Sequence, residues 1–129
     1  DIFKFENQKF DTILLLMNGT GIAGTLSGLD ILLFHLKSLL NPNGQILIDS
    51  SDLIYLFEEE DGSALININA GNYYGEMTFQ TEYKNWISKP FPWLYVDKEN
   101  LKHSVEKNQL KIAKLFNGQH YDYLAQITL

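Results

Sequence analysis

The chain has 129 residues, of which 45% are hydrophobic and 20% charged, and these proportions are typical of one folded domain or a piece of one. The formal net charge is −6 and the basic residues are scattered lysines, a pattern that argues against a nucleic-acid partner. The absence of cysteine excludes disulfides, thiolate metal sites and cysteine nucleophiles, and we predict a cytoplasmic protein. No apolar run reaches the length of a membrane span, so no membrane partner is expected.

The first half of the chain predicts a strand, a helix and a second strand. Residues 12–17 are an unbroken apolar run, which is typical of a strand buried on both faces, and leucines then recur at helical spacing. Such a unit implies a parallel sheet covered by helices. The predicted elements are a strand over 12–17, a helix over 29–40 capped by Ser27 or Asp30, a turn at 41–44 and a strand over 45–49.

The second half predicts shorter elements. Residues 50–52 can cap a short helix through Phe57, and the acidic segment 58–72 should be a flexible loop. Residues 73–96 read as an inserted hairpin and a Pro-rich segment, in which a strand over 73–83 pairs with 86–88 while Pro90 and Pro92 break regular structure. The chain should then end in a helix over 97–108 capped by Asp97, and in an antiparallel hairpin of strands over 110–116 and 121–129.

One glycine motif opens an alternative function. Gly19, Gly21 and Gly24 match the pattern G-x-G-x-x-G after a strand, which is a dinucleotide-binding signature. Three observations weaken this alternative: the helical periodicity starts only near Leu29, Asp49 lies 25 positions after Gly24, and too few parallel strands follow. A loop that needs a flexible or positive-φ backbone is the commoner cause of such glycines.

Two stretches resemble the class I S-adenosylmethionine-dependent methyltransferases. They are Phe-Asp-Thr-Ile-Leu-Leu-Leu-Met-Asn-Gly at 10–19 and Leu-Leu-Asn-Pro-Asn-Gly-Gln-Ile-Leu-Ile at 39–48. In that family an "FD-hydrophobic" strand is the fourth of the sheet, and an L-x-P-G-G turn leads into the fifth. Here Asn43 replaces the first of the two glycines, which a turn tolerates. The C-terminal hairpin looks like the family's reversed hairpin, and Phe-Pro-Trp-Leu-Tyr-Val-Asp at 91–97 resembles a bacterial subgroup.

This resemblance implies an α/β fold with a partial Rossmann-like methyltransferase sheet, mostly parallel and closed by the C-terminal antiparallel hairpin. The family's Gly-rich cofactor loop follows its first strand, and no such strand lies in this sequence. The resemblance therefore implies that residues 1–129 are the C-terminal half of a methyltransferase domain. The complete domain would use S-adenosylmethionine as its cofactor. This chain alone should bind it weakly or not at all, and should be inactive.

The resemblance also implies which residues contact the cofactor. Asp1 and Ile2 align with an acidic-plus-apolar pair that contacts the adenine, and Met17, Asn18 and Gly19 follow the strand that lines the methionine side and the substrate pocket. The carboxyl ends of parallel strands are where α/β folds bind ligands. The sequence identifies no catalytic residue, no metal ligand and no methyl acceptor.

Several of these residues could instead have a purely structural role. Asn18 could be a turn residue that bonds its own backbone, and Asp49, Ser50 and Ser51 on the same rim could cap a helix. Five aromatic residues could form a wall over a substrate or simply pack in the core and hairpin: Tyr73, Tyr74, Trp86, Trp93 and Tyr95. The rival function from another class is a non-catalytic α/β interaction module.

A missing N-terminal half would also leave one edge of the strand over 12–17 unpaired. An exposed apolar strand edge is a template for pairing with another chain. We therefore predict that the chain forms a homodimer through the strand edge at 12–17.

Overall fold

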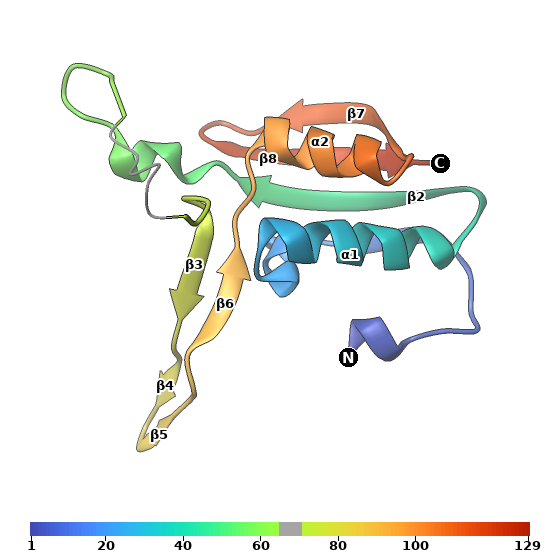
Figure 1. Ribbon diagram of the computed structural model, residues 1–129, viewed down its shortest axis with the longest axis horizontal. Helices are drawn as coiled ribbons and strands as arrows, with labels where there is room; N and C mark the ends of the chain where they lie inside the picture. Colours follow the sequence, from blue (N-terminus) through green and yellow to red (C-terminus); the bar gives the residue numbers. More distant parts are fainter. Residues whose placement is uncertain (65–70) are drawn as a thin grey trace.

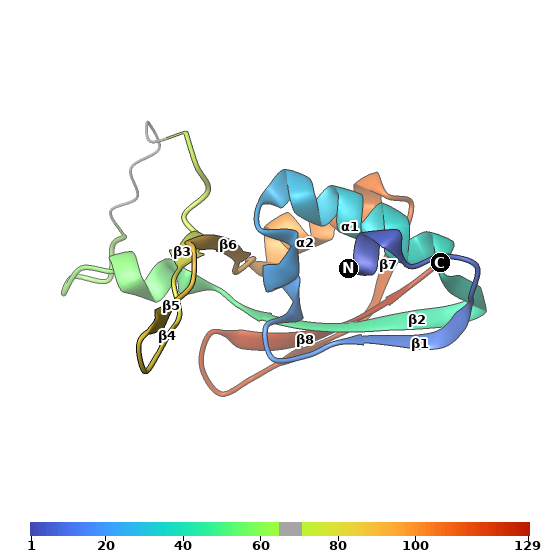
Figure 2. The same ribbon diagram turned by 90° about the horizontal axis from the view of Figure 1, so that it is seen from below.

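The computed structural model describes residues 1–64 and 71–129. It contains a four-stranded sheet with both α-helices on one face, and a narrow β-ribbon that extends away from the end of the sheet (Figures 1 and 2). The helices are η1 (Ile2–Lys4), η2 (Gly19–Ala23) and η3 (Leu53–Phe57), which are short 3₁₀ helices, and α1 (Leu26–Ser38) and α2 (Lys98–Lys107). The strands are β1 (Phe10–Leu15), β2 (Leu40–Ser51), β3 (Glu76–Phe79), β4 (Glu82–Tyr83), β5 (Trp86–Ile87), β6 (Phe91–Leu94), β7 (Lys111–Asn117) and β8 (Asp122–Thr128).

The main sheet has the strand order β1-β2-β8-β7. β1 and β2 are parallel, whereas β8 is antiparallel to both β2 and β7. The prediction of a mostly parallel sheet is therefore wrong: the α/β fold has a mixed sheet whose pairings are mostly antiparallel. The physical reason is that β8 returns from β7 through a tight hairpin and inserts beside β2, so one strand makes both antiparallel pairings. The predicted C-terminal antiparallel hairpin is confirmed.

The hydrophobic core lies between one face of the sheet and the two helices (Figure 2). Alternate side chains of β2 and β8 point to this face, and the leucines of α1 meet them at helical spacing. The fully or almost fully buried side chains include Leu29, Leu32, Leu33 and Leu36 of α1, Ile46 and Ile48 of β2, Leu101 and Val105 of α2, and Ala125 and Ile127 of β8.

Helix α1 begins earlier than predicted. Its N-cap is Thr25, whose Oγ1 accepts a hydrogen bond from the Gly28 N–H at 3.0 Å, so the prediction of Ser27 or Asp30 as the cap is wrong. Asp30 instead lies in the second turn, where its carboxylate pairs with Lys107 of α2 at 2.5 Å. The sequence pattern missed this start because Ser27 and Gly28 in the first turn are weak helix formers.

Strand β2 is longer than predicted. It begins at Leu40, and the segment predicted as a turn at 41–44 is an irregularity within its pairing with β1. Phe10 pairs with Leu40 and Thr12 with Gln45, so β2 has more residues than β1 between these two pairs and bulges out of the pairing. Asn43 lies in this bulge and has a left-handed φ of 67°.

The segment 73–96 forms the ribbon. β3 pairs with β6 and β4 pairs with β5, so the predicted hairpin is present, but the single strand predicted over 73–83 is two strands. The prediction that Pro92 breaks regular structure is also wrong, because Pro92 lies within β6. A two-stranded ribbon has only edge strands, and an edge strand tolerates a residue without an N–H donor.

The remaining sequence predictions concern η3, the acidic segment and the second helix. Asp52 caps η3 through the Ile54 N–H, and Asp97 caps α2, as predicted. Within 58–64 the chain folds back on itself through a bridge between Glu58 and Ala64. Residues 65–70 of the predicted flexible loop lie outside the described residues, and its mobility stays a prediction. In the described part of the chain, no helix is both long and apolar enough to cross a membrane.

Candidate functional site

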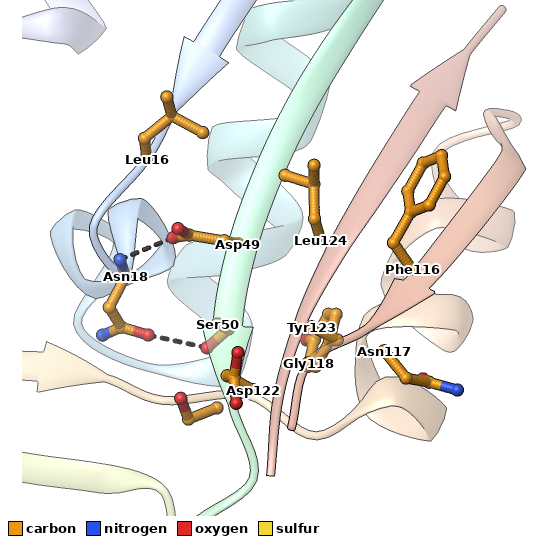
Figure 3. A pocket seen from close by; sticks show the side chains of 11 residues that line it. Leu16, Asn18, Asp49, Ser50, Phe116, Asn117, Gly118, Asp122, Tyr123 and Leu124 are labelled. Carbon is orange, nitrogen blue, oxygen red and sulfur yellow. Dashed lines mark hydrogen bonds between the residues drawn. The ribbon is translucent and has the colours of Figure 1, made fainter. Parts of the chain in front are cut away.

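The main chain turns sharply where β1 ends. Met17 and Asn18 both have a left-handed backbone, with φ of 58° and 57°, and this region is uncommon for residues other than glycine. Both of their N–H groups donate to one carboxylate from the end of β2. Met17 N lies 3.1 Å from Asp49 Oδ2, and Asn18 N lies 2.6 Å from Asp49 Oδ1, the second of which Figure 3 shows. Asp49 therefore holds the turn from the neighbouring strand.

The Asn18 side chain joins three strand ends. Its Oδ1 accepts the hydroxyl hydrogen of Ser50 at 2.7 Å, as Figure 3 shows, and its Nδ2 donates to the Leu94 carbonyl at 3.2 Å. The Ser50 hydroxyl also accepts the Val96 N–H at 3.0 Å, and the Thr20 hydroxyl lies within 3.1 Å of both Ser50 Oγ and the Leu94 carbonyl. Asn18 is thus a turn residue, but its side chain bonds across to β2 and β6 instead of to its own backbone. This buried network fixes the base of the ribbon to the ends of β1 and β2.

A cavity of about 340 Å³ opens at this turn (Figure 3). Its lining includes Leu16 and Asn18 after β1, Asp49 and Ser51 of β2, and Phe116 and Asp122 of the β7–β8 hairpin. The cavity thus lies beyond the carboxyl ends of two parallel strands, where α/β folds bind ligands. Its lining contains two carboxylates and no lysine, so its charge favours a cationic group over an anionic one.

The tyrosines near the site remain protonated. Burial raises the pKa of Tyr123, whose hydroxyl donates to the Val96 carbonyl at 2.7 Å. Burial, followed by the hydrogen bond to Asp97, also raises the pKa of Tyr73, and burial with the hydrogen bond to Asp52 raises that of Tyr74. Because a raised pKa disfavours the phenolate, none of these tyrosines is suited to act as a general base at neutral pH.

The structure brings together three of the five residues predicted to contact the cofactor. Met17 is 91% exposed at the turn, Asn18 lines the cavity, and Gly19 begins η2 directly after them. Asp1 and Ile2 lie elsewhere: Asp1 caps η1 through the Phe3 N–H. Ile2 lines a separate apolar cavity of about 280 Å³ with Phe5, Phe10 and the end of α1. Their predicted role in binding adenine remains a prediction.

The glycines of the G-x-G-x-x-G pattern are explained by packing. They lie in and after η2, and a Cβ added to Gly21 would come within 1.9 Å of the Trp93 ring of β6. Gly24 has a left-handed φ of 73° and packs against Pro92. Gly21 is therefore required because another chain segment approaches closely, and its buried backbone offers no open face to a pyrophosphate group.

The five aromatic residues do not form a wall at this cavity. Tyr73 and Tyr74 donate to Asp97 and Asp52 at 2.5 and 2.6 Å, Trp93 covers Gly21, and Trp86 is 61% exposed on the ribbon. None of the five, Tyr95 included, lines the cavity beside Asn18. The contacts of Tyr73, Tyr74 and Trp93 favour the packing interpretation for these three, whereas Trp86 is exposed.

Sequence reasoning missed part of the site. Phe116 and Asp122 belong to the C-terminal hairpin, and their only signal was the Asn117-Gly118 turn between them. Asp49 was placed on the correct rim, but the proposed helix-cap role is wrong because Asp52 caps η3. Within the described ranges, no group of three or more histidine, aspartate or glutamate side chains is arranged to hold a metal ion.

The solved structures to which this chain is similar are methyltransferases. It is 45% identical to an S-adenosylmethionine-dependent methyltransferase from Bacteroides fragilis, whose structure contains S-adenosyl-L-homocysteine. The two superpose with a TM-score of 0.87 over 99% of this chain and 52% of that one. A methyltransferase from Clostridium acetobutylicum and CcbJ from Streptomyces caelestis share the fold, with TM-scores of 0.66 and 0.64 at 12% and 9% identity. This chain covers 62% and 61% of these two proteins.

No model of a protein family matches the sequence, and no curated protein matches it. The chain spans about half the length of the Bacteroides fragilis enzyme. The β1 strand with its following turn at Met17 and Asn18, the mixed sheet and the similarity to that enzyme lead to one conclusion. The chain has the fold of the S-adenosylmethionine-dependent methyltransferases, and over nearly its whole length it is similar in sequence to one of them.

Proposed function

We propose that this chain is the C-terminal half of a methyltransferase domain, and that the complete domain transfers a methyl group from S-adenosylmethionine to an acceptor. The observation that carries the proposal is the 45% identity to an enzyme bound to S-adenosyl-L-homocysteine, of which the chain spans only 52%. The acceptor is not identified, and a cytoplasmic location stays a prediction of the sequence.

The uncovered face of the sheet supports this proposal. Both α-helices pack on the opposite face (Figure 2). Leu14 of β1 and Leu16 directly after it are 58% and 49% exposed, and Phe116 of β7 is 51% exposed. Leu47 and Leu124 lie on the same face, because they pair with Leu14 and Phe116 in the register of the sheet. Contiguous exposed apolar side chains mark a surface that another chain segment or protein covers, so a further chain segment is expected on this face.

The cavity at the turn is compatible with the proposed cofactor. When bound, S-adenosylmethionine supplies the methyl group from a positively charged sulfonium. Asp49 and Asp122 give the cavity a negative wall without a lysine. Met17, Asn18 and Gly19 would hold the methionine side of the cofactor through the turn, and Asp1 and Ile2 would contact the adenine. Catalysis would rest mainly on the alignment of the sulfonium with the acceptor.

Calorimetric titration tests the half-domain proposal. Alone, the chain should bind S-adenosyl-L-homocysteine with a dissociation constant well above about 10 µM, which corresponds to roughly 7 kcal/mol. Mixed with the N-terminal half of the Bacteroides fragilis enzyme, it should bind at least tenfold more tightly than either half alone. Tight binding by the chain alone contradicts the half-domain proposal, and a mixture that binds no better than its parts contradicts the proposed complementation.

We also propose that the isolated chain is a homodimer through the strand edge at 12–17. In support, β1 is an end strand of the sheet and carries the exposed Leu14. Sedimentation at micromolar concentration should give a dimer, and Leu14→Lys should shift it to a monomer near 14.8 kDa. Phe34→Lys, at an exposed position on α1, is the matched control and should remain dimeric. A wild-type monomer would rule this interface out.

A further inference from the structure

The turn after β1 needs an external constraint. Met17 and Asn18 are consecutive non-glycine residues in the left-handed region, with φ of 58° and 57°. Such conformations are sparsely populated and persist where the surrounding structure fixes them. The Asn18 side chain is bonded to Ser50 and Leu94, whereas the Met17 side chain is exposed and holds nothing in place.

Asp49 supplies the constraint on the main chain. Its two carboxylate oxygens accept one N–H each, from Met17 at 3.1 Å and from Asn18 at 2.6 Å. A bidentate carboxylate on two adjacent N–H groups fixes both peptide planes at once, and bonds to a charged acceptor are stronger than neutral ones. Asp49 does not serve the next helix, since Asp52 caps η3 and bonds Tyr74. Its carboxylate thus has no described hydrogen-bond partner apart from this turn.

We propose that Asp49 is a positioning residue of the methyltransferase site. It acts through the main chain of Met17 and Asn18, so that the turn presents one fixed surface to the ligand. The ligand part of this proposal rests on the proposed function, whereas the effect on the turn does not. The conservative replacement Asp49→Asn should remove one of the two hydrogen bonds to the turn, because a carboxamide offers one acceptor oxygen and an NH₂ donor to two N–H groups. Its effects on the turn and on ligand binding can be measured separately.

The first arm measures amide hydrogen exchange by NMR in this chain alone. Asp49→Asn should speed exchange of the Met17 and Asn18 amides at least about tenfold. Asp52→Asn is the matched control: it makes the same chemical change three residues along, at a carboxylate that bonds the Ile54 N–H and the Tyr74 hydroxyl. It should leave the exchange of the Met17 and Asn18 amides unchanged. Equal exchange in wild type and Asp49→Asn would overturn the proposal whatever the protein's activity.

The second arm measures S-adenosyl-L-homocysteine binding to the reconstituted domain by calorimetry, with the unfolding midpoint of each variant as the stability readout. Asp49→Asn should raise the dissociation constant at least tenfold. Asp52→Asn should leave the dissociation constant unchanged, even if it lowers the unfolding midpoint as much as Asp49→Asn does. Equal affinity in wild type and Asp49→Asn, despite faster exchange, would overturn the positioning role. Absence of binding in the wild type would instead overturn the proposed function, while the exchange arm still decides whether Asp49 holds the turn.

Discussion

Replacing Gly21 by alanine should destabilise the fold, because the position has no room for a methyl group. Gly21 is buried in η2, and a Cβ at this position would lie 1.9 Å from Cε2 and 2.1 Å from Nε1 of Trp93. No heavy-atom contact of that length is tolerated, so either η2 or the indole ring must move. Movement of the ring would uncover η2, and movement of η2 would strain the turn that carries Asn18.

The expected magnitude is a balance of two effects. Overpacking of a filled site typically costs about 1–3 kcal/mol. Against this, alanine restricts the unfolded chain more than glycine does, which stabilises by about 0.4–1 kcal/mol. Trp93 is only half-buried and can partly yield, so we expect Gly21→Ala to lower the free energy of unfolding by about 1–2 kcal/mol. For a chain of this size that corresponds to roughly 3–10 °C in the unfolding midpoint.

Urea denaturation monitored by circular dichroism measures the effect, and a double-mutant cycle tests its cause. Trp93→Leu removes the indole ring that the new methyl group would meet. If the clash is the cause, Gly21→Ala should cost at least about 1 kcal/mol less in the Trp93→Leu background, because contacting residues are coupled. Additive effects of the two substitutions would refute the explanation that Trp93 leaves no room for a side chain at Gly21. A stabilising effect of Gly21→Ala would refute the close approach of Trp93 to Gly21.

Three further substitutions test other parts of the structure. Ser50→Ala should cost about 1–3 kcal/mol in urea denaturation, because it leaves the buried Val96 N–H without an acceptor; a cost below about 0.5 kcal/mol would contradict the network. Leu33→Ala, on the buried face of α1, should cost about 2–5 kcal/mol, and a smaller loss would contradict its full burial. Burial acts to raise the pKa of Asp97, but hydrogen bonds led by those from Asn100 lower it overall. Asp97 should therefore stabilise the fold at neutral pH. This stabilisation should be lost as the pH falls below about 4, the usual pKa of an aspartate, and then through the lower pKa of Asp97 in the folded state. In urea titrations, the loss of stability between pH 7 and pH 3 should be smaller in Asp97→Asn than in the wild type. An unchanged acid dependence in Asp97→Asn would contradict this role.

The sequence alone determined the elements that depend on neighbouring residues. The leucine spacing of α1 and the caps Asp52 and Asp97 act over a few positions along the chain, and each was predicted from the sequence. The apolar run at 12–17 also predicted a strand, but β1 spans Phe10–Leu15, and the prediction that it is buried on both faces is wrong because Leu14 is 58% exposed. Helix periodicity, cap hydrogen bonds and tight hairpin turns are local, so a single sequence contains them. The strand that leads to Asn18, and with it half of the candidate site, followed from such local signals.

Only the tertiary structure decided which of these elements meet. It placed β8 between β2 and β7, which made the sheet mostly antiparallel. It separated Asp1 and Ile2 from the turn, and it set the Asp49 carboxylate on N–H groups more than 30 positions away. Gly21 likewise meets Trp93 only through the return of the ribbon. Contacts across such distances depend on which apolar faces can be buried together and in which strand register, and no local pattern encodes that choice.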